Sequence, residues 1–157
     1  LATALNPSVL IADEPTTALD VTVQAQILES LRTRQRELKM GMLLITHDLA
    51  VVAAVADRVA VMYSGEIVEE APVNDLFDNP KHPYTQGLLG AIPDITARRG
   101  FLHAIPGRVP PPQVSPPGCE FAPRCGYSID PCWEQRPALL PTSVGKLRCI
   151  NPQPFLT

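Results

Sequence analysis

Residues 8–20, Ser-Val-Leu-Ile-Ala-Asp-Glu-Pro-Thr-Thr-Ala-Leu-Asp, decide the fold class of this 157-residue chain. Val9–Ala12 is a short continuous apolar run, which is typical of a strand buried on both faces in a parallel sheet. Asp13 and Glu14 follow it directly, and in open parallel sheets ligands bind beyond the carboxyl ends of the strands. One carboxylate there can hold Mg²⁺ while its neighbour orients an attacking water. Because an isolated Asp-Glu pair is more often a solvated turn, the interpretation depends on the rest of the chain.

The residues after this stretch predict a helix and a second strand. Apolar residues from about Val21 to Lys39 fall mostly on one stripe, which indicates a helix. Asp20 is placed to cap its N-terminus, and Gly41 follows its end. The apolar run Met42–Thr46 predicts the second strand. Strand, helix and strand at this spacing form a βαβ unit, so we expect an α/β fold with mostly parallel strands.

The chain changes character further along. The elements expected next are a helix over Leu49–Val55, a hairpin of strands Val59–Tyr63 and Glu66–Glu69, and short helices near residues 73–77 and 84–91. From Ile92 onward we expect mostly loops, because most of the 18 prolines lie in the later part of the chain. The prolines of residues 110–117 predict an extended linker that leads into four cysteines.

A second motif lies at the end of the second predicted strand. This motif, Ile45-Thr46-His47-Asp48, would open at the same edge of the sheet as the acidic pair. Residues 10–20 resemble the Walker B strand and D-loop of ABC ATPases, and residues 45–48 resemble the switch-histidine motif of that family. The order and spacing of the two motifs also match the family. A lone histidine after a strand is more often a capped or surface residue, so the assignment of His47 to the site depends on its position beside the acidic pair.

The resemblance covers essentially the whole chain and implies a role for each residue at this edge. Asp13 would contact Mg²⁺ through water, Glu14 would polarise the attacking water as general base, and His47 would sense the γ-phosphate. Asp20 would reach across a dimer of ATPase subunits and help to set the facing site. The implied cofactors are therefore ATP and Mg²⁺.

The phosphate-binding motifs of the family do not occur in these 157 residues. There is no G-x-x-x-x-G-K-[ST] loop, no glutamine loop and no Leu-Ser-Gly-Gly-Gln signature. Leu1–Leu5 resembles the end of the helix that follows the signature. We therefore expect a C-terminal piece that begins just after the signature, binds ATP weakly or not at all, and is inactive alone.

The segments after the hairpin resemble one branch of the family. Tyr63–Glu70, His82-Pro83-Tyr84-Thr85 and the Pro-Pro-Gly-Cys-x-Phe-x-x-Arg-Cys stretch from Pro116 resemble the ATPases of dipeptide, oligopeptide and nickel importers. The resemblance implies an energy-coupling subunit bound peripherally at the cytoplasmic face of the inner membrane. Its partners would be a second ATPase subunit and the transmembrane permease subunits, with an external binding protein as an indirect partner.

Three parts of the chain follow from these patterns. Residues 1–70 would be the C-terminal part of the ABC ATPase core, and residues 71–97 a helical segment specific to the importer branch. Residues 98–157 would be a proline-rich extension that carries the four cysteines.

The cysteine spacing leaves several alternatives open. The residues are Cys119, Cys125, Cys132 and Cys149, and their gaps differ from the pair-of-pairs pattern of common zinc sites. Four thiolates suit either a [4Fe–4S] cluster or Zn²⁺, and the irregular gaps favour the cluster. Arg124 and Arg148 each precede a cysteine and would offset thiolate charge. Buried free thiols or disulfides, without a metal, are the remaining alternatives.

Two other functions stay open beside the importer subunit. A soluble ABC ATPase of DNA repair or translation would share Glu14 and His47 but not the His-Pro-Tyr-Thr segment or the cysteines. The other is a non-catalytic metal-binding or interaction module. The net charge of −3 and the lack of a basic stripe argue against nucleic acid as a partner. No apolar run approaches the roughly 18 residues of a membrane span.

Overall fold

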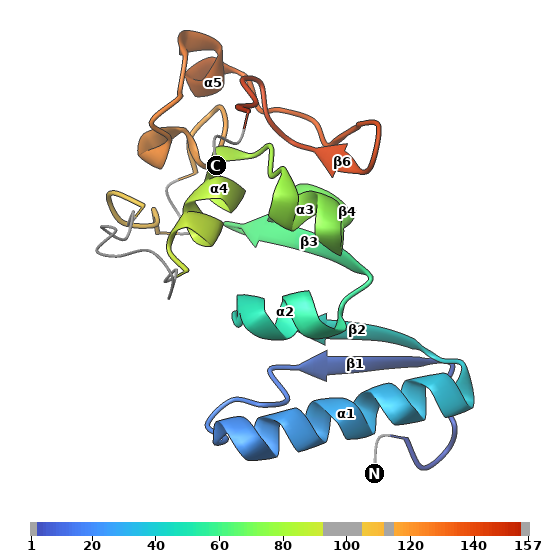
Figure 1. The fold of residues 1–157 in the computed structure, drawn as a ribbon. Helices are drawn as coiled ribbons and strands as arrows, with labels where there is room; N and C mark the ends of the chain where they lie inside the picture. Colours follow the sequence, from blue (N-terminus) through green and yellow to red (C-terminus); the bar gives the residue numbers. More distant parts are fainter. Residues whose placement is uncertain (1–2, 93–104, 112–114, 155–157) are drawn as a thin grey trace. The chain divides into compact units, whose positions relative to one another are not determined.

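The computed structural model describes residues 3–92, 105–111 and 115–154 (Figure 1). The chain divides into two compact units, Leu1–Ala56 and Asp57–Thr157. The first unit contains a parallel strand pair with two helices, and the second contains an antiparallel sheet with short helices. The predicted α/β class is therefore confirmed.

The first unit is built on two parallel strands, β1 (Val9–Asp13) and β2 (Gly41–Ile45). Their register runs from Val9 opposite Gly41 to Asp13 opposite Ile45. The helix α1 (Val21–Leu38) connects them, and α2 (Leu49–Val55) follows β2. The predicted strand–helix–strand unit is confirmed, with small shifts at the element ends.

Both ends of α1 are capped, by a side chain at the N-terminus and by a backbone N–H at the C-terminus. The Asp20 carboxylate accepts from the N–H groups of Thr22 and Val23 at 3.0 and 2.9 Å, so the predicted N-cap is confirmed. At the other end, Lys39 adopts a left-handed conformation with φ 51°. The left-handed residue after this helix is thus Lys39, whereas Gly41 already begins β2.

The two helices lie beside each other and cover one face of the β1–β2 pair. Gln24 of α1 donates to Asp48 before α2 at 3.1 Å, and Arg32 donates to the Ala54 carbonyl at 3.0 Å. Burial alternates along β1, with Leu10 and Ala12 buried.

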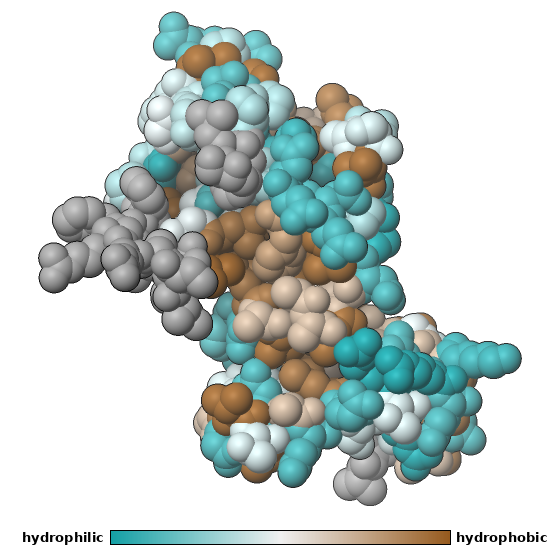
Figure 2. Space-filling model, in the orientation of Figure 1, coloured by the Kyte–Doolittle hydropathy of each residue, from teal (hydrophilic) through white to brown (hydrophobic). Residues whose placement is uncertain are grey.

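The other face of this pair is open. Its exposed apolar residues are Val9, Ile11, Leu43 and Ile45, with Ile11 64% exposed. Apolar surface is visible around these strands in Figure 2. The apolar run is typical of a strand buried on both faces, but in the described residues β1 is covered on one face only, because α1 and α2 lie on one side of a two-stranded sheet.

The second unit begins with the hairpin of β3 (Arg58–Tyr63) and β4 (Glu66–Pro72). Ser64 and Gly65 form the turn with φ of 49° and 80°, the positive values that a two-residue hairpin loop requires. Two short strands, β5 (Leu140–Pro141) and β6 (Lys146–Leu147), extend the sheet in the order β3-β4-β6-β5.

All pairings in this second sheet are antiparallel. The prediction of mostly parallel strands is therefore wrong for the part of the chain that the structure describes, where it holds only for β1 and β2. The physical reason is the connection between strands. A parallel pair needs a crossover such as α1, whereas the Ser64–Gly65 turn joins its strands directly and can only reverse the chain.

The described residues of this unit also form four helical segments: α3 (Val73–Asp78), α4 (Pro83–Gly90), a 3₁₀ turn over Ala122–Arg124, and α5 (Asp130–Glu134). The core contains Val61, Tyr63, Val68, Ala71, Leu76 and Phe121. Phe121 packs edge-on against Tyr63 with ring centroids 5.2 Å apart. Part of the cysteine region thus belongs to the core of this unit, although we expected mostly loops there.

Some predictions lie wholly or partly outside the described residues. They concern Leu1 and Ala2, residues 93–97 of the predicted helical segment, and Pro112 of the proline run. Thr3–Leu5 form a turn. Across the described helices, none combines the length and apolar character needed to cross a membrane.

Candidate functional site

Glu14 and His47 meet at the carboxyl ends of β1 and β2. The Glu14 Oε1 atom lies 3.0 Å from Nδ1 of His47. The Glu14 N–H donates to the Ile45 carbonyl at 2.9 Å, which extends the strand pairing by one residue. Parallel pairing therefore brings the two motifs to one edge, as predicted.

A third residue, Thr17, holds the other oxygen of this carboxylate. Thr17 Oγ1 donates to Glu14 Oε2 at 2.8 Å. The hydrogen bond from Thr17, followed by that from His47, lowers the pKa of Glu14 below its usual value. The carboxylate is therefore charged at neutral pH and accepts hydrogen bonds through both oxygens.

The two aspartates flanking this site have different surroundings. Asp13 is the last residue of β1 and is exposed. An exposed carboxylate at a strand end fits Mg²⁺, which commonly binds one or two carboxylates together with substrate phosphates. Asp20 lies at the start of α1, where its carboxylate caps the helix. The structure thus brings Glu14 and His47 together, while Asp20 belongs to the helix cap.

The four cysteines line one small cavity in the second unit, together with His82 and Phe121. Cys125 follows the 3₁₀ turn, and Cys132 lies in α5. The Cys119 N–H donates to the Cys132 carbonyl at 2.8 Å, which closes this segment on itself. All four residues are free thiols, so the disulfide alternative is not realised in this structure.

Burial raises the pKa of three of these thiols. It raises the pKa of Cys149 to about 12, and it also raises the pKa of Cys119 and Cys125. Neighbouring cysteines add to each of these shifts, because thiolates close together repel one another. A bound cation would favour the thiolate form of the same four groups.

A single Zn²⁺ and a [4Fe–4S] cluster need different arrangements of the four thiols. Among the described residues, no group of three or more His, Cys, Asp or Glu side chains is placed to hold a metal ion. As they stand, the four thiols do not fit a single Zn²⁺, which needs four ligands around one point. A [4Fe–4S] cluster is held from outside by four cysteines, and the four that line this cavity would be its ligands, but the cavity of about 10 Å³ has room for about one water molecule and not for a cube.

His82 of the His-Pro-Tyr-Thr segment borders the cysteine cavity and is only 1% exposed. Its Nδ1 accepts the Tyr84 N–H at 3.0 Å and so caps α4. Burial lowers the pKa of His82 to about 4, and a hydrogen bond to the Arg148 backbone partly opposes this shift. The buried Glu69 carboxylate accepts the backbone N–H groups of Lys81 and His82 at 2.7 and 3.0 Å. The start of this segment is therefore held by the Glu69 carboxylate on one side and by the His82 cap of α4 on the other.

Comparison with known proteins finds similar ATP-binding proteins of peptide transporters. The model described as "Oligopeptide/dipeptide transporter, C-terminal region" matches residues 68–132, which include the His-Pro-Tyr-Thr segment and three of the cysteines. The oligopeptide transport ATP-binding protein AppD of Bacillus subtilis is 54% identical over 151 residues. Over 96% of its length, the chain is thus similar to a peptide-transporter ATP-binding protein. The alignment with the Bacillus protein covers 96% of this chain and 46% of that protein.

Other similar proteins also have names that refer to peptide import. Putative peptide import ATP-binding proteins of Brucella melitensis and Brucella abortus are each 52% identical over 149 residues, or 95% of this chain and 45% of theirs. The chain thus spans about half the length of the relatives that it matches.

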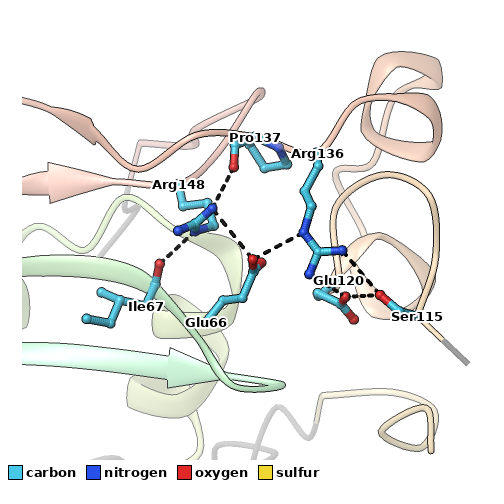
Figure 3. A network of polar contacts seen from close by, with 7 residues as sticks. All are labelled: Glu66, Ile67, Ser115, Glu120, Arg136, Pro137 and Arg148. Carbon is cyan, nitrogen blue, oxygen red and sulfur yellow. Dashed lines mark hydrogen bonds and ion pairs between the residues drawn. The ribbon is translucent and has the colours of Figure 1, made fainter. Parts of the chain in front are cut away.

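Two arginines, Arg136 and Arg148, join the region after residue 115 to the hairpin of β3 and β4 (Figure 3). Arg148 donates to the carbonyls of Ile67 and Pro137, each at 2.9 Å. Arg136 pairs with Glu66 at 3.1 Å and with the buried Glu120 at 2.9 Å, and Ser115 also donates to Glu120.

The arginines proposed to offset thiolate charge have other contacts. Arg148 is used in the network just described, and Arg124 donates to the carbonyls of Ile105 and Pro106 at 3.3 and 2.9 Å. Both guanidinium groups therefore hold backbone segments in place. This role requires the folded path of residues 105–107, which the sequence does not specify.

Sequence reasoning missed two residues near Glu14 and His47. Thr17 was read only as part of a motif, although a hydroxyl three residues after a carboxylate is a common local partner. Asp48 caps α2 by accepting from Ala50 and Val51 at 2.9 and 3.3 Å. An aspartate directly before an apolar run is an N-cap signal that would have revealed it.

Proposed function

We propose that this chain is part of the ATP-hydrolysing, energy-coupling subunit of an ABC importer for dipeptides or oligopeptides. The observation that carries the proposal is the 3.0 Å contact between Glu14 Oε1 and His47 Nδ1 at the ends of two parallel strands. The 54% identity with an oligopeptide transport ATP-binding protein supports the transporter branch. The match of residues 68–132 favours it over a soluble ABC ATPase, which would not share that region.

In the proposed mechanism, Glu14 is the general base. Its charged carboxylate would take a proton from water, and the water oxygen would attack the γ-phosphorus as ADP leaves. His47, whose side chain is 78% exposed, is available to contact the γ-phosphate. Asp13 would hold Mg²⁺, which neutralises charge on the phosphates when bound. Asp20 would help to set the facing site of an ATPase dimer.

The remaining assignments are part of the same proposal. Residues 1–70 would complete an ABC ATPase core, residues 71–97 would be specific to the importer branch, and residues 98–157 would form the cysteine extension. The partners would be a second ATPase subunit and transmembrane permease subunits at the cytoplasmic face of the membrane. By itself the chain is expected to bind ATP weakly, because the phosphate-binding loop is not within its 157 residues.

A structural role for the cysteines completes the proposed function. The four cysteines that line one cavity would hold a [4Fe–4S] cluster, for which that cavity would have to widen. Cys149 and the other three cysteines come from different segments, so a cluster would fasten the end of this unit to its middle. We assign it a structural role and not a catalytic one, because the cysteines are remote from Glu14 in sequence.

Replacing Glu14 in the full-length ATP-binding protein tests this function. Glu14→Gln removes the base but keeps the shape of the side chain, so ATP turnover should fall at least about 100-fold while ATP binding remains. Glu29→Gln is the matched control, because Glu29 is exposed on α1. Turnover that survives Glu14→Gln would exclude Glu14 as the base. A wild-type protein that binds ATP but never hydrolyses it, even with its permease, would overturn the whole proposal.

A further inference from the structure

The Glu14 carboxylate is held by two partners of different kinds. Thr17 donates to Oε2 at 2.8 Å, and His47 lies 3.0 Å from Oε1. Each oxygen therefore has one partner, and a carboxylate oxygen can accept more than one hydrogen bond. What differs is how firmly each partner is attached to Glu14.

Thr17 belongs to the same turn as Glu14. The Thr17 N–H donates to the Glu14 carbonyl at 3.2 Å, and the Glu14 N–H donates to Ile45 of β2 at 2.9 Å. Glu14 has a left-handed backbone with φ 44°, a conformation that the surrounding hydrogen bonds must stabilise in a residue other than glycine. The distance between the two side chains is thus set by the turn itself.

His47 is attached more loosely. It comes from the segment after β2, and its side chain is 78% exposed. A ring that exposed can exchange Glu14 for another acceptor without unfolding the loop. Thr17 would keep its bond to Oε2 during such an exchange, because both residues move with one turn.

We propose that Thr17 is a positioning residue for Glu14: its hydroxyl holds Oε2 and thereby presents Oε1 toward His47 and the attacking water. The inference rests on the proposed function, because it assigns a role within the same site. The Glu14 side chain is 47% exposed, so little packing restricts its rotamers. A hydrogen bond to a charged oxygen supplies the restriction that packing does not.

Threonine replacements in the full-length protein, assembled with its permease, test this role. Thr17→Val keeps the shape of the side chain and removes the hydroxyl, so kcat for ATP hydrolysis should fall about tenfold, the equivalent of one lost hydrogen bond. The KM for ATP should stay within about twofold, because the Thr17 hydroxyl is committed to Glu14. Thr17→Ser restores the hydroxyl and should recover most of kcat. Thr33→Val is the matched control on the exposed side of α1.

The outcomes separate this inference from the proposed function. A tenfold loss in Thr17→Val, with recovery in Thr17→Ser, supports it. An unchanged kcat in Thr17→Val, in a protein that Glu14→Gln inactivates, overturns the positioning role and leaves the proposed function intact. An equal loss in Thr17→Val and Thr17→Ser, with normal thermal unfolding of both, also overturns it, because the hydroxyl would then be irrelevant.

Discussion

Gly118 packs directly against the backbone of Cys132. A Cβ atom at residue 118 would overlap the Cys132 carbonyl oxygen and lie 2.6 Å from the carbonyl carbon of Trp133. The neighbouring Cys119 N–H donates to that same Cys132 carbonyl at 2.8 Å. The close approach of these two segments therefore depends on the missing side chain of Gly118.

Gly118→Ala should accordingly destabilise the second unit. The backbone atoms in the way cannot rotate aside as a flexible side chain does, so we expect a loss of about 2 kcal/mol in the free energy of unfolding. Urea unfolding of the purified chain would measure it. Gly126→Ala is the control, because nothing lies within 4 Å of a Cβ atom there. Equal stability of the two variants would show that the backbones of residues 118 and 132 separate easily.

Arg136→Ala tests the network of Figure 3. Glu120 is only 6% exposed, and removing Arg136 takes away the cation that pairs with its buried carboxylate, which keeps Ser115 as a partner. We expect a loss of roughly 2 kcal/mol in the free energy of unfolding, because an unpaired buried charge is costly. Arg58→Ala removes a more exposed pair with Glu70 in the same unit and should cost about 1 kcal/mol or less. A smaller loss for Arg136→Ala than for Arg58→Ala would contradict this ranking.

Asp48 gives the first unit an acid-sensitive contact. The hydrogen bond from Gln24, followed by those from Val51 and Ala50, lowers the pKa of Asp48 below 3.8. A lowered carboxyl pKa favours the folded state above the unfolded pKa, and this contribution is lost as the pH falls through the folded one. Wild-type stability should therefore drop as the pH is lowered below about 4.

Asp48→Asn should remove that part of the pH dependence. The amide keeps one oxygen for the helix cap, so the variant should remain folded at neutral pH. Thermal unfolding between about pH 3 and pH 6, the range that spans the ordinary aspartate pKa, would compare it with wild type. Asp78→Asn, at an exposed position, should retain the wild-type slope below pH 4. A steeper acid loss in Asp48→Asn than in wild type would reverse the assigned sign.

Purification of the chain without oxygen tests the cysteine site. About four irons and a broad absorption band near ~400 nm are expected for a [4Fe–4S] cluster. Cys149→Ser should lose this band, because Cys149 lines the same cavity as the other three cysteines. About one zinc and no colour would exclude the cluster and show that the thiols rearrange around a single ion. Protein that contains neither iron nor zinc would exclude both metals and leave the four cysteines as free thiols.

Local patterns predicted the first unit well, and the reason is visible in its residues. Asp20 caps α1, and the apolar runs form β1 and β2, because these features depend on residues close in sequence. The meeting of Glu14 and His47 also followed from the parallel pairing of those strands. The exposure of one face of β1 did not follow from local patterns, because an apolar residue such as Ile11 does not show in sequence whether another element covers it.

The second unit was harder to predict because its contacts are distant in sequence. β6 has two residues, too few for a periodic pattern, and it exists because Lys146 and Leu147 pair with Glu70 and Glu69 of β4. The hydrogen bond from Arg148 to the Ile67 carbonyl likewise joins residues that are distant in sequence. Such pairings depend on the folded path of the whole segment, which local propensity does not specify.

The return of the chain to the first hairpin has a topological consequence. Lys146 and Leu147 pair with β4, and further along Gln153 accepts from the Gln86 side chain at 2.9 Å and donates its N–H to the Lys81 carbonyl at 3.3 Å. The turn from Thr142 to Gly145, by contrast, is mostly exposed. A protease that nicked this turn would cut the covalent chain without releasing its final stretch. That stretch would stay in place as a noncovalently bound peptide, like the smaller partner of a split protein.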